Sequence, residues 1–408
     1  MNTRNKLQVV FALGIVLLHP LSSISLHAQS DSTAAVPSEI PNKAKGGGTK
    51  FLLAGKAQQS WTNTKVEGSP SSHTFYPDAL MLMPLVKLND RLFLDAQIEV
   101  DPNPTGGAAI NLNEMIVYYR ATNCLNIFAG NFSPKYGLYM GVMDDFTNRY
   151  ATNPIGMNRG PGTQTGIGIQ GGIQTGTSKL NYQLYLANGP QLIVDSTTQG
   201  NSNQTGKLNY GNYSDNNNNK AIGGSIGFLP LSNSNLQVDV SGQMAAKTGN
   251  MGTPFESVSS MSWAADLNYY HLFNPLLVRV QAEYNSTITQ NKTYPWRSTA
   301  DTTKLLVPAF NNQISGWFVG ATLRLAGVKN TILSNFELGA RVGGYTPPQY
   351  TSLPSTPAVW GENAEQQTTV CLTYWFTWKT PLNFAYDMLS TKGSPAITTY
   401  TARFIYFF

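Results

Sequence analysis

The sequence predicts an all-β fold, a transmembrane antiparallel β-barrel of sixteen strands that occupies residues 49–408. Two patterns predict it. From residue 49 onward, short segments alternate between apolar and polar side chains, as strands do when one face meets lipid and the other meets water. The connections between these segments also alternate, between short turns and long polar loops. Because the phase of both patterns holds along the whole chain, the two faces and the two ends of the barrel are predicted together.

The alternation is clearest where charged and apolar residues interleave. In segment 91–101, Leu92, Leu94 and Ala96 point to one face, whereas Asp95 and Gln97 point to the other. Segments 74–88 and 110–120 alternate less regularly, because apolar residues occur on both of their faces. In chain order, the predicted strands are residues 49–61, 74–88, 91–101, 110–120, 124–132, 163–174, 179–188, 221–229, 236–247, 261–271, 276–285, 317–325, 332–342, 368–379, 382–388 and 397–408.

The connections indicate how the barrel is oriented. Seven connections are short: residues 89–90, 121–123, 176–178, 230–235, 273–275, 327–330 and 380–381. The remaining connections are mostly long and rich in Asn, Gly, Ser and Pro. A barrel with both termini in the periplasm has short periplasmic turns and long outer loops. We therefore expect the seven short turns in the periplasm and the long loops at the cell surface.

The last strand carries aromatic residues at alternate positions. Its outward face is Tyr400, Phe404, Tyr406 and Phe408, and Arg403 lies on the other face. Aromatic side chains collect where lipid meets water, so this face suits a girdle at the membrane surface. The pattern also resembles the C-terminal signal of bacterial outer-membrane barrels. We therefore predict that these four residues form an assembly signal, that the barrel assembly machinery and outer-membrane lipid are partners, and that this strand pairs with the first.

The N-terminal segment has the features of a secretory signal peptide. Arg4 and Lys6 precede an apolar run at residues 9–18, and a Ser-rich region ends at Ala28. The apolar run is too short for a spanning helix, which needs about 20 residues. We predict a signal peptide at residues 1–28, a flexible periplasmic segment at residues 29–48, and a location in the outer membrane of a Gram-negative bacterium.

The composition argues against several other classes of function. Charged residues make up 12% of the chain, and the net charge of +5 is too small to imply nucleic acid as a partner. Cys124 and Cys371 lie on separate predicted strands, so we expect two free thiols. His73 lies at the edge of a loop and His271 points outward, so we find no catalytic site and expect no enzyme activity. No motif predicts a metal or another cofactor.

A barrel of this size encloses an aqueous channel, so charged residues on the inward face need no further role. Each could be an ordinary solvated wall residue. We expect Arg403 in a wide part of the lumen. The predicted lumen wall includes Arg91, Glu99, Arg279, Glu283, Arg324, Glu337 and Arg341.

The third outer loop, residues 133–162, is the strongest candidate for a functional segment. A loop of this length inside a compact domain is usually functional or disordered, and the many aromatic and Met residues argue against disorder. We expect it to fold inward against the barrel wall, the alternative being an ordered external lid. Its predicted pore-constricting residues are Lys135, Asp144, Asp145, Arg149 and Arg159.

Local motifs around this loop resemble a known family. They are Gly130-Asn131-Phe132-Ser133-Pro134-Lys135-Tyr136-Gly137, then Arg159-Gly160 with Gly166-Ile167-Gly168, and the strand end from Tyr182 to Gly189. Together they are similar to the phosphate-selective porin O/P-like family of outer-membrane porins. This resemblance implies a sixteen-stranded homotrimeric pore narrowed by its third loop. The phosphate-selective members line their pores with Arg and Lys, whereas this loop also contains Asp144 and Asp145.

These observations favour a passive porin for small hydrophilic solutes, with a weak preference for anions. Two alternatives remain open. One is a barrel that takes up a specific substrate, either an oligosaccharide or an apolar compound. The other is a structural or adhesive surface barrel. An apolar transport path is less consistent with the polar inward faces of the strands.

Overall fold

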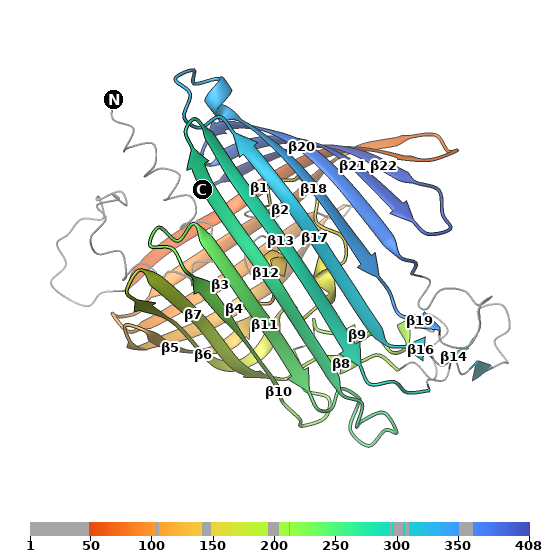
Figure 1. Cartoon of the computed structure of the whole chain (residues 1–408). Helices are drawn as coiled ribbons and strands as arrows, with labels where there is room; N and C mark the ends of the chain where they lie inside the picture. The colour runs from red at the N-terminus through yellow and green to blue at the C-terminus, as the bar shows by residue number, and fades with distance from the viewer. Residues whose placement is uncertain are drawn as a thin grey trace.

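The protein is described from a computed structural model. The described residues are 49–102, 106–140, 148–194, 204–211, 213–293, 296–297, 305–306, 310–350 and 362–408. Within them, sixteen antiparallel strands form one closed barrel in the order β1-β2-β3-β4-β5-β6-β7-β10-β11-β12-β13-β17-β18-β20-β21-β22. Figure 1 shows these strands tilted around a common interior. The predicted signal peptide and N-terminal segment, residues 1–48, lie outside the described residues.

The barrel strands are β1 (Lys50–Val66), β2 (Ser72–Lys87), β3 (Leu92–Pro102), β4 (Ala108–Thr122), β5 (Leu125–Phe132), β6 (Gln164–Thr175), β7 (Ser178–Ala187), β10 (Ala221–Leu229), β11 (Leu236–Ala245), β12 (Ser260–Phe273), β13 (Leu276–Thr289), β17 (Gln313–Arg324), β18 (Phe336–Thr346), β20 (Glu365–Thr377), β21 (Thr380–Thr391) and β22 (Ile397–Phe407). Three two-stranded sheets lie in the long loops: β8 (Gln191–Leu192) with β9 (Leu208–Asn209), β14 (Trp296–Arg297) with β15 (Leu305–Leu306), and β16 (Phe310–Asn311) with β19 (Gln349–Tyr350). Two short 3-10 helices are η3 (Met157–Arg159) and η5 (Leu333–Asn335).

The barrel confirms the predicted order and number of strands, but several predicted boundaries differ by up to about five residues, and two of these differences have a clear local cause. Arg91 is exposed in the turn before β3, because the Asn89 side chain accepts the backbone N–H groups of Arg91 and Leu92 and holds a tight turn there. Arg91 is therefore not a residue of the lumen wall. The strand predicted to begin at residue 332 begins at Phe336, because the Asn330 side chain accepts the N–H groups of Ile332 and Leu333 ahead of η5.

The seam between the first and last strands closes the barrel. β1 pairs with β22 from Lys56 opposite Phe407 to Val66 opposite Ile397. Phe408 extends this pairing, since its N–H donates to the Gly55 carbonyl at 3.1 Å and its own carbonyl accepts the Gly55 N–H at 3.2 Å. Gly55 also leaves room for the ring of Phe408, whose Cζ would lie 2.6 Å from a Cβ added at this position. The seam therefore leaves no open sheet edge beside Gly55.

The outer surface is apolar and has aromatic residues near both ends. Leu184, Val240 and Val319 are among the lipid-facing residues that are about half exposed. Trp263 contacts Tyr284 near the loop end of β12 and β13, with ring centroids 5.3 Å apart. Near the short turns, a second aromatic group consists of Phe336, Tyr374, Phe376, Phe404, Tyr406 and Phe408. This arrangement is typical of a barrel whose apolar band lies between two aromatic girdles.

Cys124 is exposed and Cys371 is buried, and both are free thiols, as predicted. No helix among the residues that the structure describes is long and apolar enough to cross a membrane.

Candidate functional site

Loop 3, which connects β5 to β6 through residues 133–163, lies inside the barrel, as the sequence predicts. The yellow segment after β5 follows the inner wall in Figure 1. Its residues form hydrogen bonds with side chains on strands from β4 to β22, and the alternative of an external lid is therefore wrong. Residues 141–147 of the loop, which include Asp144 and Asp145, lie outside the described residues.

The first part of loop 3 is fixed by inward-facing polar side chains. Gln183 on β7 accepts the N–H of Lys135 at 2.9 Å, and Ser241 on β11 accepts that of Gly137 at 2.9 Å. Glu283 on β13 accepts the N–H of Tyr139 at 2.7 Å. Glu283 is therefore a buried anchor of the loop rather than a solvated wall residue. These three hydrogen bonds attach the loop to the inner wall at β7, β11 and β13.

Two arginines of the wall hold the second part of loop 3. Arg403 on β22 donates to the carbonyl of Asn148 at 2.9 Å, and Arg341 on β18 donates to that of Thr152 at 3.0 Å. Both side chains are only 2% exposed. The expected position of Arg403 in a wide, solvated part of the lumen is therefore wrong. Side-chain oxygens of Thr152, Thr369 and Asn383 accept further hydrogen bonds from these two guanidinium groups, which would otherwise be costly to bury.

Arg149 lies deep in the lumen, beside the end of β20 that leads into a short turn. Its guanidinium group lies over the ring of Trp375, 4.5 Å from the centroid, and Arg324 lies 5.7 Å from the same centroid. Trp375 donates from Nε1 to Glu337 at 3.0 Å. Burial lowers the pKa of Arg149 to about 10, while Glu337 opposes this shift, so Arg149 remains protonated at neutral pH. The charges of Arg149, Arg324 and Glu337 are thus close together at this depth.

An apolar cluster inside the barrel supports the start of loop 3. It consists of buried side chains on neighbouring strands, with the Phe132 and Tyr185 ring centroids 5.3 Å apart. Sequence reasoning missed this cluster, although apolar residues on both faces of the fourth and fifth predicted strands were a signal for it. The members are Ile116, Tyr118, Phe128, Phe132, Tyr185 and Ala187.

At the outer end of the lumen, Glu362 joins three segments that are distant in the sequence. Its carboxylate is 2.6 Å from Nζ of Lys207 and 3.6 Å from Nη2 of Arg159, and it accepts the hydroxyl of Tyr345 at 2.5 Å. Burial raises the pKa of Glu362, but Lys207, Tyr345 and Arg159 together outweigh that effect and hold it below its usual value. Glu362 is therefore ionised at neutral pH, with two cations beside it.

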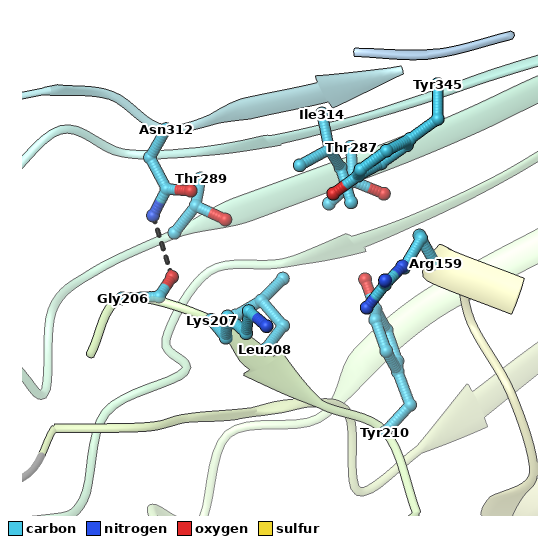
Figure 2. Close-up of a pocket in the computed structure, with 10 residues that line it drawn as sticks. All are labelled: Arg159, Gly206, Lys207, Leu208, Tyr210, Thr287, Thr289, Asn312, Ile314 and Tyr345. Carbon is cyan, nitrogen blue, oxygen red and sulfur yellow. Dashed lines mark hydrogen bonds between the residues drawn. The ribbon is translucent and has the colours of Figure 1, made fainter. Parts of the chain in front are cut away.

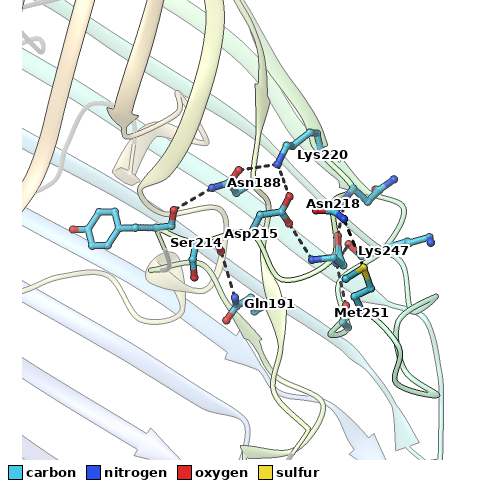
Figure 3. Close-up of polar contacts among 12 residues, drawn as sticks. Asn188, Gln191, Ser214, Asp215, Asn218, Lys220, Lys247 and Met251 are labelled. Atoms are coloured by element: carbon cyan, nitrogen blue, oxygen red, sulfur yellow. Dashed lines mark hydrogen bonds and ion pairs between the residues drawn. The ribbon is translucent and has the colours of Figure 1, made fainter.

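The loop between β7 and β10, which supplies Lys207, is held at the rim by polar contacts. Lys220 forms an ion pair with Asp215 and also donates to Asn188, and Gln191 donates to the carbonyl of Ser214 (Figure 3). Asn216 donates to the carbonyl of Thr248 in the next outer loop at 2.8 Å. Contacts within the described part of this loop, and contacts with the loop between β11 and β12, therefore fix its position.

The three described basic residues that were predicted to constrict the pore do not form one cluster. Lys135 is near Asp239 on β11, Arg149 is at the deep site, and Arg159 is at the outer end. Burial lowers the pKa of Lys135, and the charge of Asp239 opposes this shift. The positive charges of the loop are therefore distributed along the length of the lumen.

Of the remaining predicted wall residues, Glu99 accepts a hydrogen bond from Asn113 at 2.6 Å, and Arg324 donates to the carbonyl of Ser334 at 2.8 Å. The positive charge of Arg279 attracts the carboxylate of Glu337. Within the described ranges, no group of three or more His, Cys, Asp or Glu side chains could hold a metal ion.

The barrel has counterparts among solved structures of outer-membrane proteins. The outer-membrane channel DcaP of Acinetobacter baumannii has a TM-score of 0.53 at 14% identity, covering 90% of this chain and 99% of that one. Salmonella typhi OmpF in complex with daunomycin has a TM-score of 0.53 at 13% identity, covering 88% and 98%. An anion-selective porin from Comamonas acidovorans has a TM-score of 0.51 at 12% identity, covering 88% and 100%.

No protein-family model matches the chain, and no curated protein matches its sequence. At identities this low, the structural likeness shows the fold alone. The class that this fold defines is the sixteen-stranded outer-membrane type of β-barrel.

Proposed function

We propose that this protein is a porin in the outer membrane of a Gram-negative bacterium, where it forms a water-filled channel for passive diffusion of small hydrophilic solutes. The observation that supports this proposal most directly is the closed barrel with a polar inward face and a loop anchored inside it. A loop in this position narrows a channel without replacing it by a packed core. The named outer-membrane channels and porins that share the fold also support the proposal.

The finer features of the function are proposals of the same kind. We propose a homotrimer and a relationship to the phosphate-selective porin O/P-like family, on the motifs around Phe132, Arg159 and Tyr182. A trimer form of OmpT of Vibrio cholerae has a similar fold, with a TM-score of 0.50. We also propose that the protein is not an enzyme.

Conductance in a planar lipid bilayer tests the channel. We expect the purified, folded barrel to insert into the bilayer and raise the current in uniform steps. The size of each step should be proportional to salt concentration, because ions diffuse through a water-filled lumen without saturating a binding site. Heat-denatured protein in the same detergent is the control. Failure of the folded barrel to produce steps would show that the lumen is closed and that the protein is a structural barrel.

Reversal potential in a salt gradient then measures selectivity. We expect a weak anion preference that moves toward cations when Lys135, Arg149 and Arg159 are all replaced by Gln, because basic side chains select anions where the path is narrow compared with the screening length, about 8 Å at physiological salt. The variant Lys247→Gln, which removes one positive charge from an ion pair with Glu256 outside the lumen, should keep the parental value.

The N-terminus of the membrane form tests the proposed signal peptide. We expect cleavage after Ala28, because a small residue at that position follows a basic start and a short apolar run. Mass spectrometry of the protein from outer membranes should find Gln29, or a near neighbour, at the N-terminus. An intact Met1 in that fraction would exclude removal of the segment.

A further inference from the structure

A cavity of about 120 Å³ lies at the outer end of the lumen. Figure 2 shows side chains from loop 3, the β7–β10 loop, β13 and β17–β18 around one space. Thr287 and Thr289 of β13 are buried, whereas Ile288 between them faces lipid and is 43% exposed. The cavity is therefore on the inner side of the wall. The lining residues are Arg159, Gly206, Lys207, Leu208, Tyr210, Thr287, Thr289, Asn312, Ile314 and Tyr345.

The charges at the cavity favour one negative charge on a ligand. Arg159 and Lys207 line it, and Glu362 is the carboxylate paired with both. Arg159, Lys207 and Glu362 together carry a net charge of about +1, and a second carboxylate, Glu365 on β20, also interacts with Arg159 and Glu362 through its charge. Lys207 is within hydrogen-bond distance of Glu362, but the 3.6 Å contact of Arg159 is longer than a hydrogen bond. The guanidinium group of Arg159, with its five N–H donors, can therefore still receive an anion.

The neutral part of the lining favours hydroxyl groups. Thr287 and Thr289 provide hydroxyls, and Tyr210 places its phenol 2.9 Å from Ser262 Oγ. Asn312 is 3% exposed and donates from Nδ2 to the carbonyl of Gly206 at 2.8 Å, which holds the β7–β10 loop against the wall. The rings of Tyr210 and Tyr345 and the side chain of Ile314 add apolar surface. The lining therefore combines fixed polar groups with apolar faces about as large as a ring.

The volume limits the ligand to about one ring. A cavity of about 150 Å³ by the same kind of measure holds benzene, so about 120 Å³ plus the open side toward the lumen suits a single six-membered ring. A chain of several sugars would extend into the lumen. The segments that form the cavity are also fixed relative to one another, because Glu362 contacts Lys207, Arg159 and Tyr345.

We infer that this cavity is a binding site for a hydroxylated monoanion of single-ring size, a sugar acid, at the entrance of the lumen. The inference rests on the proposed channel function and names a class of solute for it. The carboxylate would lie against Arg159 and Lys207, and the hydroxyls would face Thr287, Thr289 and Asn312. The ring would lie beside Tyr345 and Ile314.

Ligand-observed NMR titration of the folded barrel in detergent tests binding without any need for conduction. The probe is D-glucuronate, which combines one carboxylate with ring hydroxyls. D-glucose lacks the charge, and cyclohexanecarboxylate lacks the hydroxyls. We expect D-glucuronate to bind with a dissociation constant of about 1 mM, as befits so small a ligand, and each comparator to bind at least about fivefold more weakly. Equal binding of all three compounds, or binding of none, would overturn the inference.

Variants test the assigned contacts by the sign of their effects. Arg159→Gln should weaken D-glucuronate binding about fivefold, which is modest because Arg159 is 42% exposed. Glu362→Gln keeps the shape and an acceptor but removes the competing charge, so it should strengthen binding. The matched control Lys247→Gln should leave binding unchanged. An unchanged affinity in Arg159→Gln, or a weaker one in Glu362→Gln, would refute the site.

The bilayer experiment separates this inference from the channel function. If the barrel conducts and D-glucuronate does not bind, the channel function stands and the sugar-acid site is wrong. If D-glucuronate binds with the expected pattern but no current passes, the channel function is wrong and the site belongs to a surface barrel with a receptor role, which contradicts the inference as an entrance site.

Discussion

Deletion of Phe408 should lower the yield of folded, heat-modifiable barrel at least about tenfold. The deletion removes two backbone hydrogen bonds between Phe408 and Gly55 and exposes the edge of β1 next to lipid. An unsatisfied backbone group in hydrocarbon costs several kcal/mol, and about 1.4 kcal/mol corresponds to a tenfold change in equilibrium. The measurement is the fraction of protein that migrates as a folded band in unheated gels of outer-membrane extracts.

Two further variants separate the backbone of Phe408 from its ring. Phe408→Ala keeps the pairing with Gly55 but removes the ring that covers it, so its yield should lie between those of the deletion and the parent. Phe404→Ala removes another outward aromatic ring of β22 while its pairing with Gln59 and Leu382 remains, and it should be close to the parent. A normal folded yield in the deletion variant would mean that the seam does not limit assembly.

The strands were predictable because alternation is a local property. Each strand of the barrel is in contact with lipid on one face, and a run of roughly four to eight residues is enough to show the period of two. The exception at residues 332–335 has a local cause that alternation cannot reveal. There, the Asn330 side chain competes for backbone N–H groups and delays the start of β18.

The functional interior was less predictable because its contacts join residues that are far apart in the sequence. Arg403 and Asn148 are 255 positions apart, and Arg341 and Thr152 are 189 positions apart. An inward arginine in a wide aqueous lumen needs no partner, so nothing in its own strand shows that it holds loop 3. The outer cavity, similarly, brings Arg159, Lys207 and Tyr345 together from three separate segments.

The interior apolar cluster shows where the usual rule for barrels fails. In a barrel with a wet lumen, apolar residues mark the lipid face. Phe128 and Tyr118 instead point inward, because they pack with Phe132 and Tyr185 in an apolar cluster on the inner wall. The rule therefore holds for strands whose inner face meets solvent, and it fails locally where inward side chains pack against one another.

The double substitution Arg341→Ala with Arg403→Ala should release the second part of loop 3 and raise the single-channel conductance about twofold or more. Each guanidinium group donates to a loop carbonyl, and a hydrogen bond to a charged group contributes about 1.5–3 kcal/mol. The loss of both would shift the loop toward a detached state by roughly a hundredfold or more. The barrel itself should remain folded, because the pairing of β18 and β22 with their neighbours is unchanged.

Two measurements identify the loop as the cause. Hydrogen–deuterium exchange should accelerate at residues 148–155 and remain slow in the strands, which does not depend on conduction. The matched control is Arg279→Ala with Arg324→Ala, which removes the same charge from the wall. The hydrogen bonds of Arg324 go to Ser334 and Asn335 rather than to loop 3, and both arginines repel Arg149 of the loop, so their loss should not release it. If the two double variants have the same exchange and the same conductance, then charge in the lumen, and not the attachment of loop 3, controls the width of the path.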